Sequence, residues 1–490
     1  MHSRPAKLLL PTSAFYWFLV SAHCIALGLF PHLANAATIE PSLDSLAKPL
    51  YEIEQKIQYR QLNNGLQVRT LSLPTADNVV IASEFAVGSR DELTGQSGYA
   101  HLFEHMLFKG SQQAPGDSYA QTMAQFSGRF NASTFFEYTN YYATIPSYAL
   151  ELALWLESDR FVSPLLSQQT VENQQQTVLE EMATTIDNQP YVRQAMEFLL
   201  TQAKGSPYSH AVIGSKQDIE AATPKSLTEF HRQFYRPDNM QLTLVGQLPE
   251  TSNDWVDQYF GQWSKPGSPL PVRDKQFTFA AKQVQGQIVD SRGPWPALVL
   301  AWHTVGQGHP DAAAVSLLEQ YLLQNRNSLI RQDGLKNGEF FLSYSIPLSM
   351  HYMGVTNLVL VPRASIPLDS LTESVNAFIK DIATQGIDEA KLNQLKRAWL
   401  IQALTQLDDP TTLATQLSAT PTQDKLTPLS APWERINAVT TQQLQSVAEH
   451  YFLNGTVTLK LLPPWYIRWG KTLLEWLPTG LADTIEEWAL

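Results

Sequence analysis

Three side chains within one short segment have the types and spacing for metal chemistry. His101 and His105 lie four residues apart, with Glu104 between them, inside the otherwise apolar stretch 98–111. In a helix the two imidazoles would lie one turn apart on the same face, with the carboxylate beside them. Two neutral imidazoles from one turn suit a first-row divalent cation, most often zinc, with a third protein ligand and a water. The pattern therefore favours a catalytic zinc site over a pair of core histidines.

A third ligand must come from another part of the chain. The polar segment 172–191 predicts a helix on which Glu172, Glu180 and Glu181 could each offer a carboxylate. Helical periodicity alone does not choose among them, and acidic pairs on a helix are also typical of a solvated face. The histidines that follow His105 are scattered along the chain, which is more typical of surface or capping residues than of metal ligands. They are His210, His231, His303, His309, His351 and His450.

The first 36 residues have the pattern of a secretory signal peptide. Basic residues precede an apolar stretch over 8–30, and a small-residue cleavage motif ends at Ala36. An uncleaved membrane anchor fits less well, because Pro11 and several polar residues interrupt the apolar run. The mature chain is therefore expected to begin at Ala37.

Cysteine content and charge exclude several classes of function. The only cysteine, Cys24, lies inside the expected signal peptide, so disulfides, zinc–thiolate sites and cysteine nucleophiles are excluded from the mature chain. Any metal must be held by His, Asp or Glu. The net charge of −12 predicts that the chain does not bind nucleic acid. No second apolar run is long enough to span a bilayer, which predicts a soluble mature protein.

Two distant segments, 221–244 and 438–461, resemble each other without a gap. Each predicts a Thr-capped amphipathic helix, a short turn and an alternating strand. The similarity indicates two copies of one α+β unit. The alternative is that any helix followed by a strand looks alike.

The order His-x-x-Glu-His at 101–105 resembles the inverted zinc motif of the M16 metallopeptidases, the pitrilysin and insulin-degrading family that includes the mitochondrial processing peptidases. The resemblance continues through further blocks in the family's order and covers most of residues 58–247. It implies an α+β fold of two homologous domains, each a mixed β-sheet flanked by helices, which face each other across a cleft. The blocks are "VGSRDELTGQSGYAHLFEHMLFKGS", "NASTFFEYTNYYATIP", "ENQQQTVLEEMATTIDNQPY" and "PYSHAVIGSKQDIEAATPKSLTEFHRQFYRPDNMQLTLVG".

The resemblance also implies roles for individual residues. The family's third ligand lies about 76 residues beyond the second histidine, which falls on Glu181 here. His101, His105 and Glu181 would then hold one zinc ion per chain, with Glu104 as the general base of peptide hydrolysis. Many members carry another glutamate seven residues before the third ligand, where this chain has Gln174.

Substrate contacts are implied on both halves of the chain. The segment 131–146 alternates like a strand, and the corresponding strand of the family accepts substrate as an added strand. Asn131 and Ala132 are therefore the substrate-side candidates. In the second half, Arg331 and Tyr344 stand in the region where family members often have an Arg and a Tyr that grip substrate, although the local sequence looks shortened.

The Pro- and Gly-rich stretch 264–273 cannot continue a helix and predicts a joint between the halves. We expect a zinc-binding domain over 37–255, a linker over 256–281 and an M16-like domain over 282–463. A tail with four tryptophans follows at 464–490. Its composition suits packing on the parent protein, docking to a partner, or contact with a membrane surface.

The function that the resemblance implies is a secreted, periplasmic zinc endopeptidase acting on peptides or unfolded protein segments. Bacterial members of this length often pair with a second subunit that lacks the zinc motif, so a heterodimer or a homodimer is expected. One alternative is a non-catalytic binding or assembly subunit of an envelope complex, and another is an envelope scaffold built around the tail. Glu104 favours the enzyme, because an inactive copy needs no general base.

Overall fold

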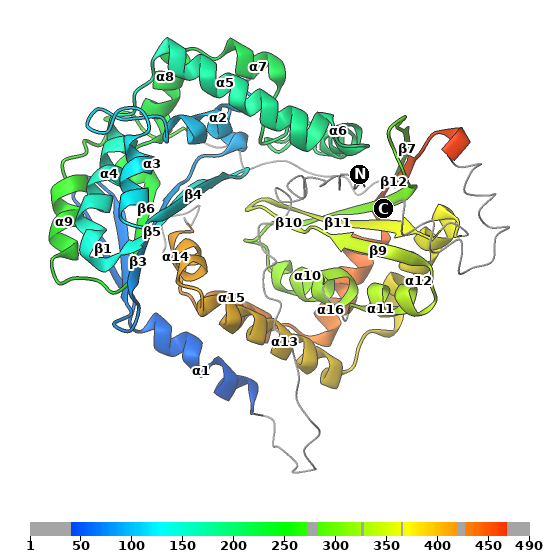
Figure 1. Ribbon diagram of the computed structural model, residues 1–490. Helices are drawn as coiled ribbons and strands as arrows, with labels where there is room; N and C mark the ends of the chain where they lie inside the picture. The colour runs from blue at the N-terminus through cyan, green and yellow to red at the C-terminus, as the bar shows by residue number, and fades with distance from the viewer. Residues whose placement is uncertain (1–40, 272–282, 325–327, 364–365, 420–426, 468–490) are drawn as a thin grey trace, which may run out of the picture.

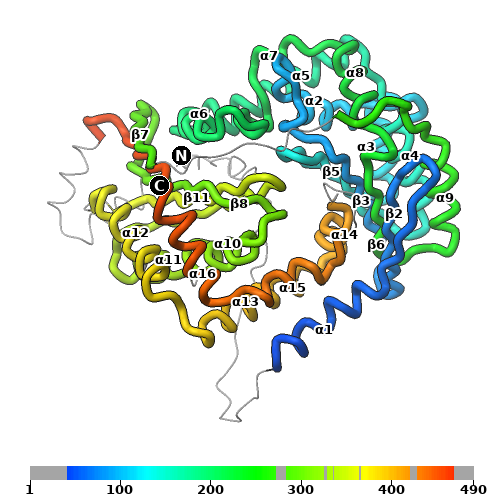
Figure 2. The backbone as a smooth tube through the Cα atoms, turned by 180° about the vertical axis from the view of Figure 1, so that it is seen from behind, coloured from blue at the N-terminus to red at the C-terminus, as the bar shows by residue number. Residues whose placement is uncertain are grey.

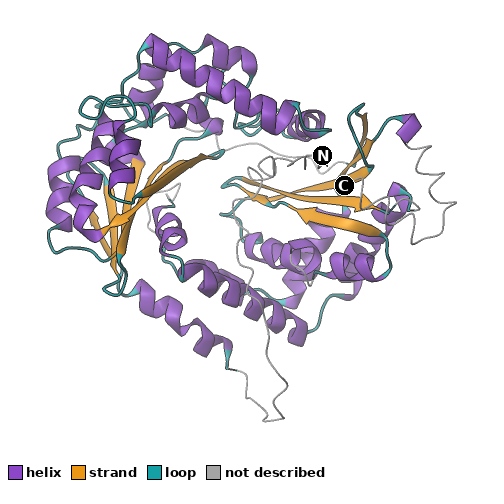
Figure 3. Cartoon of the chain, in the orientation of Figure 1, coloured by secondary structure: helices purple, strands orange, loops and turns teal. Residues whose placement is uncertain are grey.

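In the computed structural model, the strands form two six-stranded sheets, and helices pack around both (Figures 1 and 3). The expected signal peptide and all of the tail beyond residue 467 lie outside the described residues. The described residues are 41–271, 283–324, 328–363, 366–419 and 427–467.

The first sheet is mixed. Strands β2 and β6 pair in parallel and the other neighbours are antiparallel. Strand β4, the last in the order, forms one edge. In sheet order the strands are β1 (Gln58–Gln61), β2 (Gln67–Ser72), β6 (Met240–Gly246), β3 (Asn78–Phe85), β5 (Thr139–Pro146) and β4 (Arg129–Thr134).

Helices from the first half of the chain cover one face of this sheet and enclose a large apolar core with it. Short 3-10 turns connect several of the elements, and a π-helix, η4 (Ala183–Asp187), continues α5. The helices that pack in this core are α2 (Tyr99–Met106), α3 (Ser118–Gln125), α4 (Leu150–Val162), α5 (Gln168–Met182), α7 (Lys216–Ala221), α8 (Pro224–Phe234) and α9 (Ser252–Phe260).

The second sheet is built in the same way, with one parallel pair, β7 and β12, among antiparallel neighbours. Its strands are β10 (Leu348–Ser349), β11 (Met353–Pro362), β8 (Ala297–Val305), β12 (Thr456–Leu462) and β7 (Val284–Val289), with β9 (Phe340–Ser345) also on β11. The second-half helices are α10 (Ala312–Glu319), η6 (Gln320–Gln324), α11 (Leu329–Lys336), α12 (Leu368–Gln385), α13 (Glu389–Leu407), α14 (Pro410–Ser418), α15 (Ala431–Asn437), α16 (Thr441–Val447) and η7 (Ala448–Leu453). Helix α1 (Leu43–Glu54) of the first half packs on α13, and α6 (Val192–Gln202) lies against β7 and β12 of the second sheet.

The two similar segments of the sequence occupy matching places in the two sheets. Thr223 and Thr440 each cap a helix, α8 and α16, by accepting a hydrogen bond from the third residue beyond. The strand that follows, β6 or β12, lies between one parallel and one antiparallel neighbour in both cases. The fold prediction of two homologous α+β units is confirmed.

Helices α9 and α14 pack outside the domain ranges expected from the sequence. Helix α9 extends to residue 260, into the range expected to be linker, because Val256 and Phe260 are buried in the first core. Helix α14 belongs to the second half in sequence but lies on β3 and β6 of the first sheet (Figures 1 and 2). Its Leu417 carbonyl accepts hydrogen bonds from Arg69 Nη1 at 2.8 Å and Gln241 Nε2 at 2.6 Å. Among the described residues, no helix is both long and apolar enough to cross a membrane.

One buried carboxylate of the second core predicts a pH-dependent stability. Glu319 on α10 accepts a hydrogen bond from Thr356 of β11, and burial raises its pKa from 4.5 to about 7. The folded state therefore holds this proton more tightly than the unfolded state does. The stability that it contributes is complete below pH 4.5 and is lost as the pH rises through about 7.

We expect Glu319→Gln to unfold at higher urea concentration than the wild type at pH 8, with a gain on the order of 1–3 kcal/mol, and to match it near pH 4.5. Urea titrations at several pH values measure this difference. Glu373→Gln, on the exposed side of α12, is the control and should follow the wild type throughout. If the free energies of unfolding of Glu319→Gln and the wild type differed by the same amount at every pH, the assignment would be contradicted.

Candidate active site

Helix α2 carries the His-x-x-Glu-His segment into the first core. All of its residues except His105 are buried, and it packs between α5, α8 and the edge strand β4. His101 and His105 lie one turn apart, with ring centroids 4.8 Å apart and ring planes at 80°. Their side chains therefore face the same neighbour, as the spacing predicts.

That neighbour is Glu181, near the end of α5. Its Oε1 lies 3.7 Å from His101 Nε2, and its Oε2 lies 3.4 Å from His105 Nε2. One ligand atom from each of the three residues lies within 4.8 Å of the others. Two ligands at zinc's usual bond lengths, arranged tetrahedrally, lie about 3.3–3.5 Å apart. Two imidazoles and one carboxylate are a ligand set that zinc takes, and the distances of Glu181 from the two histidines lie close to that spacing.

The protonation of this cluster favours metal binding. Burial lowers the pKa of His101 to about 4, so its imidazole is neutral near pH 7. Burial alone would raise the pKa of Glu181, but the hydrogen bond from His105 and the charges of both histidines outweigh it and lower that pKa. A neutral imidazole and an ionised carboxylate are the forms that coordinate a cation.

Glu104 lies beside the cluster with a different environment. Its side chain is buried, and Thr134, the last residue of β4, donates a hydrogen bond of 2.5 Å to its Oε2. Burial raises the pKa of Glu104 to about 7. A carboxyl group with a pKa near neutrality can both take up and release a proton under ordinary conditions.

Comparison with known proteins identifies the family. Residues 67–214 match the insulinase family, peptidase family M16, and residues 221–398 match the peptidase M16 inactive domain. The chain belongs to peptidase family M16. This is a family of zinc metallopeptidases, and the M16 resemblance predicted from the sequence is confirmed.

Several M16 relatives cover most of the chain. The zinc protease PqqE of Helicobacter pylori is 24% identical over 82% of this chain and 92% of its own length. An uncharacterised zinc protease of Mycobacterium tuberculosis is 27% identical over 79% of this chain and 89% of its own.

Solved M16 structures share the fold. A protease from Helicobacter pylori superposes with a TM-score of 0.78 at 22% identity, covering 83% of this chain and all of that one. The periplasmic protease PqqL from Escherichia coli superposes with a TM-score of 0.68 at 17% identity, covering 89% of this chain and 50% of that one.

The other acidic candidates of α5 face away from the M16 zinc motif. Glu172 and Glu180 are exposed and accept hydrogen bonds from Gln168 and Gln176 of their own helix. Gln174, which stands where many M16 members have a glutamate, is buried two turns before Glu181. The solvated-face interpretation thus describes two of the three glutamates, while Glu181 reaches the histidines.

The first-half substrate candidates lie on the edge strand β4. Asn131 is exposed and Ala132 is buried, and both pair with β5, opposite Tyr142 and Tyr141. Strand β4 continues to Thr134 and thus to the hydrogen bond with Glu104. These positions are compatible with a peptide adding to the sheet edge, and their role stays a prediction.

The second-half candidates lie elsewhere in the molecule. Arg331 belongs to α11 and Tyr344 to β9, which pairs with β11. Helix α11 lies on the far side of the second half from α2 in both views (Figures 1 and 2). The structure therefore does not bring these two residues into the cluster of His101, Glu104, His105 and Glu181.

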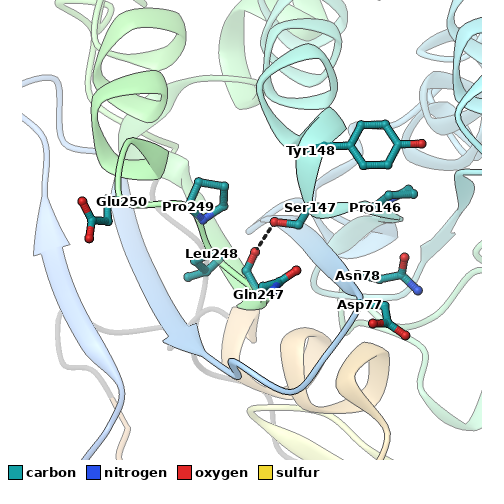
Figure 4. Close-up of a pocket in the computed structure, with 9 residues that line it drawn as sticks. All are labelled: Asp77, Asn78, Pro146, Ser147, Tyr148, Gln247, Leu248, Pro249 and Glu250. Carbon is teal, nitrogen blue, oxygen red and sulfur yellow. Dashed lines mark hydrogen bonds between the residues drawn. The ribbon is translucent and has the colours of Figure 1, made fainter.

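A shallow groove of about 700 Å³ lies at the opposite end of β5 from Thr139 (Figure 4). Its lining combines the β2–β3 turn with the ends of β5 and β6, where Ser147 donates a hydrogen bond of 2.6 Å to the Gln247 carbonyl. None of the candidate site residues lines it, so it is separate from the zinc motif.

Sequence reasoning missed two residues that contact the site. Thr134 could have been noticed as the end of the substrate strand, but its bond to Glu104 depends on how β4 packs against α2. Glu92 hydrogen-bonds the start of α2 and pairs with His210, which lies 118 residues away. No local pattern signals a contact of that length.

The choice of Glu181 over its neighbour can be tested with an isosteric pair. We expect Glu181→Gln to weaken zinc binding at least about 100-fold, more than the loss of an outer-shell partner usually costs. Glu180→Gln, one residue away on the exposed face, should bind zinc within about twofold of the wild type. Competition against a chromophoric chelator measures both. Equal losses in the two variants would contradict the assignment of Glu181.

Proposed function

We propose that this protein is an exported, periplasmic zinc endopeptidase that hydrolyses peptide bonds in peptides or unfolded protein segments. The observation that carries the proposal is the convergence of His101, His105 and Glu181 beside a buried carboxylate, Glu104. Membership of M16 and similarity to several zinc proteases support it.

In the proposed mechanism, His101, His105 and Glu181 hold the ion and Glu104 moves the proton. Zinc, when bound, polarises the scissile carbonyl and makes water a better nucleophile near neutral pH. Glu104 takes the proton of the attacking water and delivers it to the leaving amine. Thr134 orients the carboxylate through its bond to Oε2, so that the proton acceptor is fixed relative to β4.

Substrate would bind as an added strand on β4. Backbone pairing at Asn131 and Ala132 would hold an extended peptide beside Glu104, because Thr134 lies on the same strand. Backbone recognition makes small demands on side-chain identity and excludes segments already folded into helices or sheets. This supports peptides or unfolded segments as the substrate class.

A partner subunit would complete the grip on the substrate. Arg331 and Tyr344 lie on α11 and β9, away from the cluster, so the equivalent contacts would come from a second M16-like subunit or a second copy of this chain. The signal-peptide pattern supports export, as does the likeness to a protease described as periplasmic. The Trp-rich tail would add a contact with a membrane surface.

The test compares the mature protein with Glu104→Gln in zinc content and in cleavage of a quenched-peptide library. We expect the variant to retain zinc and to lose about 10²–10⁴-fold in kcat, because the proton acceptor is removed and the ligands are kept. Glu180→Gln is the matched control, with the same chemical change on an exposed surface, and should cleave at the wild-type rate.

The other outcomes separate the alternatives. A wild-type protein that binds zinc and cuts nothing, alone or with a co-purified subunit, would support the non-catalytic binding or assembly role. A wild-type protein that binds no zinc would overturn the proposal. Deletion of residues 465–490 that abolishes localisation while activity is unchanged would support the envelope-scaffold function of the tail.

A further inference from the structure

Glu92 is a buried carboxylate that lies outside the metal cluster but contacts the helix that carries it. Its side chain is 1% exposed. Its Oε2 accepts hydrogen bonds from Gly98 N at 2.9 Å and from His210 Nε2 at 3.0 Å, and its Oε1 accepts one from Ala100 N at 2.8 Å. Glu92 therefore satisfies two backbone donors at the start of α2, directly before His101.

Within the described part of the chain, helix α2 has no other side-chain cap at this end. Its N-cap residue is Gly98, which has no side chain to accept a bond and adopts φ +99°. The carboxylate that replaces the missing cap comes from six residues earlier in the chain. A buried helix start without such an acceptor would leave backbone N–H groups unpaired in the core.

A second loop holds this arrangement in place. A Cβ at Gly98 would lie 2.8 Å from the Ile213 carbonyl, and a Cβ at Gly214 would lie 2.3 Å from Gly98 Cα. The two backbones thus touch where no side chain fits. Asp218, in the first turn of α7, accepts a hydrogen bond of 2.9 Å from Ser97 N through its Oδ2. His210, on the loop that precedes α7, reaches Glu92. The hydrogen bond to Glu92 raises the pKa of His210, which favours the imidazolium that offsets the buried carboxylate.

His101, the metal-binding residue nearest to Glu92, has no hydrogen bond to any described residue on its second ring nitrogen to orient the ring. Metal-binding histidines usually donate their second ring N–H to a carboxylate or a carbonyl, which fixes the ring. His101 Nδ1 is buried and has no hydrogen-bond partner among the described residues. The direction of its ring is therefore set by the position of the α2 backbone and by packing. The side chain that binds the backbone N–H groups of Gly98 and Ala100, next to His101, is Glu92.

We propose that Glu92 and His210 form a positioning pair that sets the first turn of α2 and thereby places His101 Nε2 toward the zinc ion. The inference rests on the zinc-binding role given above. It assigns no contact between the pair and the substrate or the metal. Glu92 acts through the backbone of Gly98 and Ala100, and His210 acts by holding Glu92.

The test measures zinc affinity on folded protein rather than activity. Glu92→Gln keeps the size of the side chain but replaces one acceptor oxygen with a donor, so that one partner loses its bond. We expect its zinc dissociation constant to rise about 10–100-fold. Cobalt(II) placed in the site should show a changed visible spectrum, because the ligand geometry shifts.

Two further variants distinguish positioning from general stability. Thr440→Ala removes a helix cap of the second half and should lower the thermal midpoint while the zinc dissociation constant stays within twofold of the wild type. The side chain of His210 is 30% exposed, and we expect His210→Gln to weaken zinc binding less than Glu92→Gln does. If Glu92→Gln does not fold, the zinc dissociation constant of His210→Gln tests the inference. The double variant should bind zinc no more weakly than Glu92→Gln, because the two side chains act as one unit.

Unchanged zinc affinity and cobalt spectrum in both single variants, measured well below their thermal midpoints, would overturn the inference. These readouts do not depend on peptide cleavage. If the wild-type protein bound zinc but cut no peptide, the proposed peptidase function would be contradicted, while the effect of Glu92 and His210 on zinc affinity could still be measured. A wild-type protein that binds no zinc would overturn both.

Discussion

The burial of α2 is the constraint on which the site depends. All of its residues but His105 are buried, and a polar group in the core costs free energy unless it finds a partner there. The partners come from separate parts of the chain: Glu92 from the preceding loop, Thr134 from β4, Glu181 from α5 and Ser226 from α8. Each contact that satisfies the helix also fixes a neighbour relative to it. The sheet edge, α5 and the metal-binding turn therefore form one unit.

The second half of the chain supports this unit, although none of its described residues belongs to the metal cluster. Beyond η4, the chain that follows α5 reaches Tyr191, whose N–H donates to Asp290 and whose hydroxyl donates to the Trp295 carbonyl. Beyond β4, Glu137 accepts a hydrogen bond from the backbone N–H of His351. The elements that carry Glu181 and Thr134 are thus each fastened to the second half within about ten residues. The distance between Glu181 and Thr134 therefore depends on how the two halves of the chain pack together.

Local periodicity explains which parts of the structure could be predicted. The histidine spacing and the Thr-capped repeat are properties of single helices, and the two-sheet fold follows from repeating that unit. The choice of Glu181 over Glu180 is different, because only the facing element distinguishes two adjacent residues of α5, and it came from family resemblance. The position of α14 on the first sheet and the contact of His210 with Glu92 involve long-range packing. Periodicity carries no information about either.

The charges of the site connect metal binding with the state of the base. Glu104 and Glu181 lie close together, and among the described residues neither forms an ion pair with Lys or Arg. Burial, with a smaller contribution from the charge of Glu181, raises the pKa of Glu104 to about 7, so without a counter-charge much of it is protonated at neutral pH. A cation held by the two histidines and Glu181 favours the ionised form. A larger fraction of Glu104 is therefore in the ionised form that can accept a proton when the ligands are occupied.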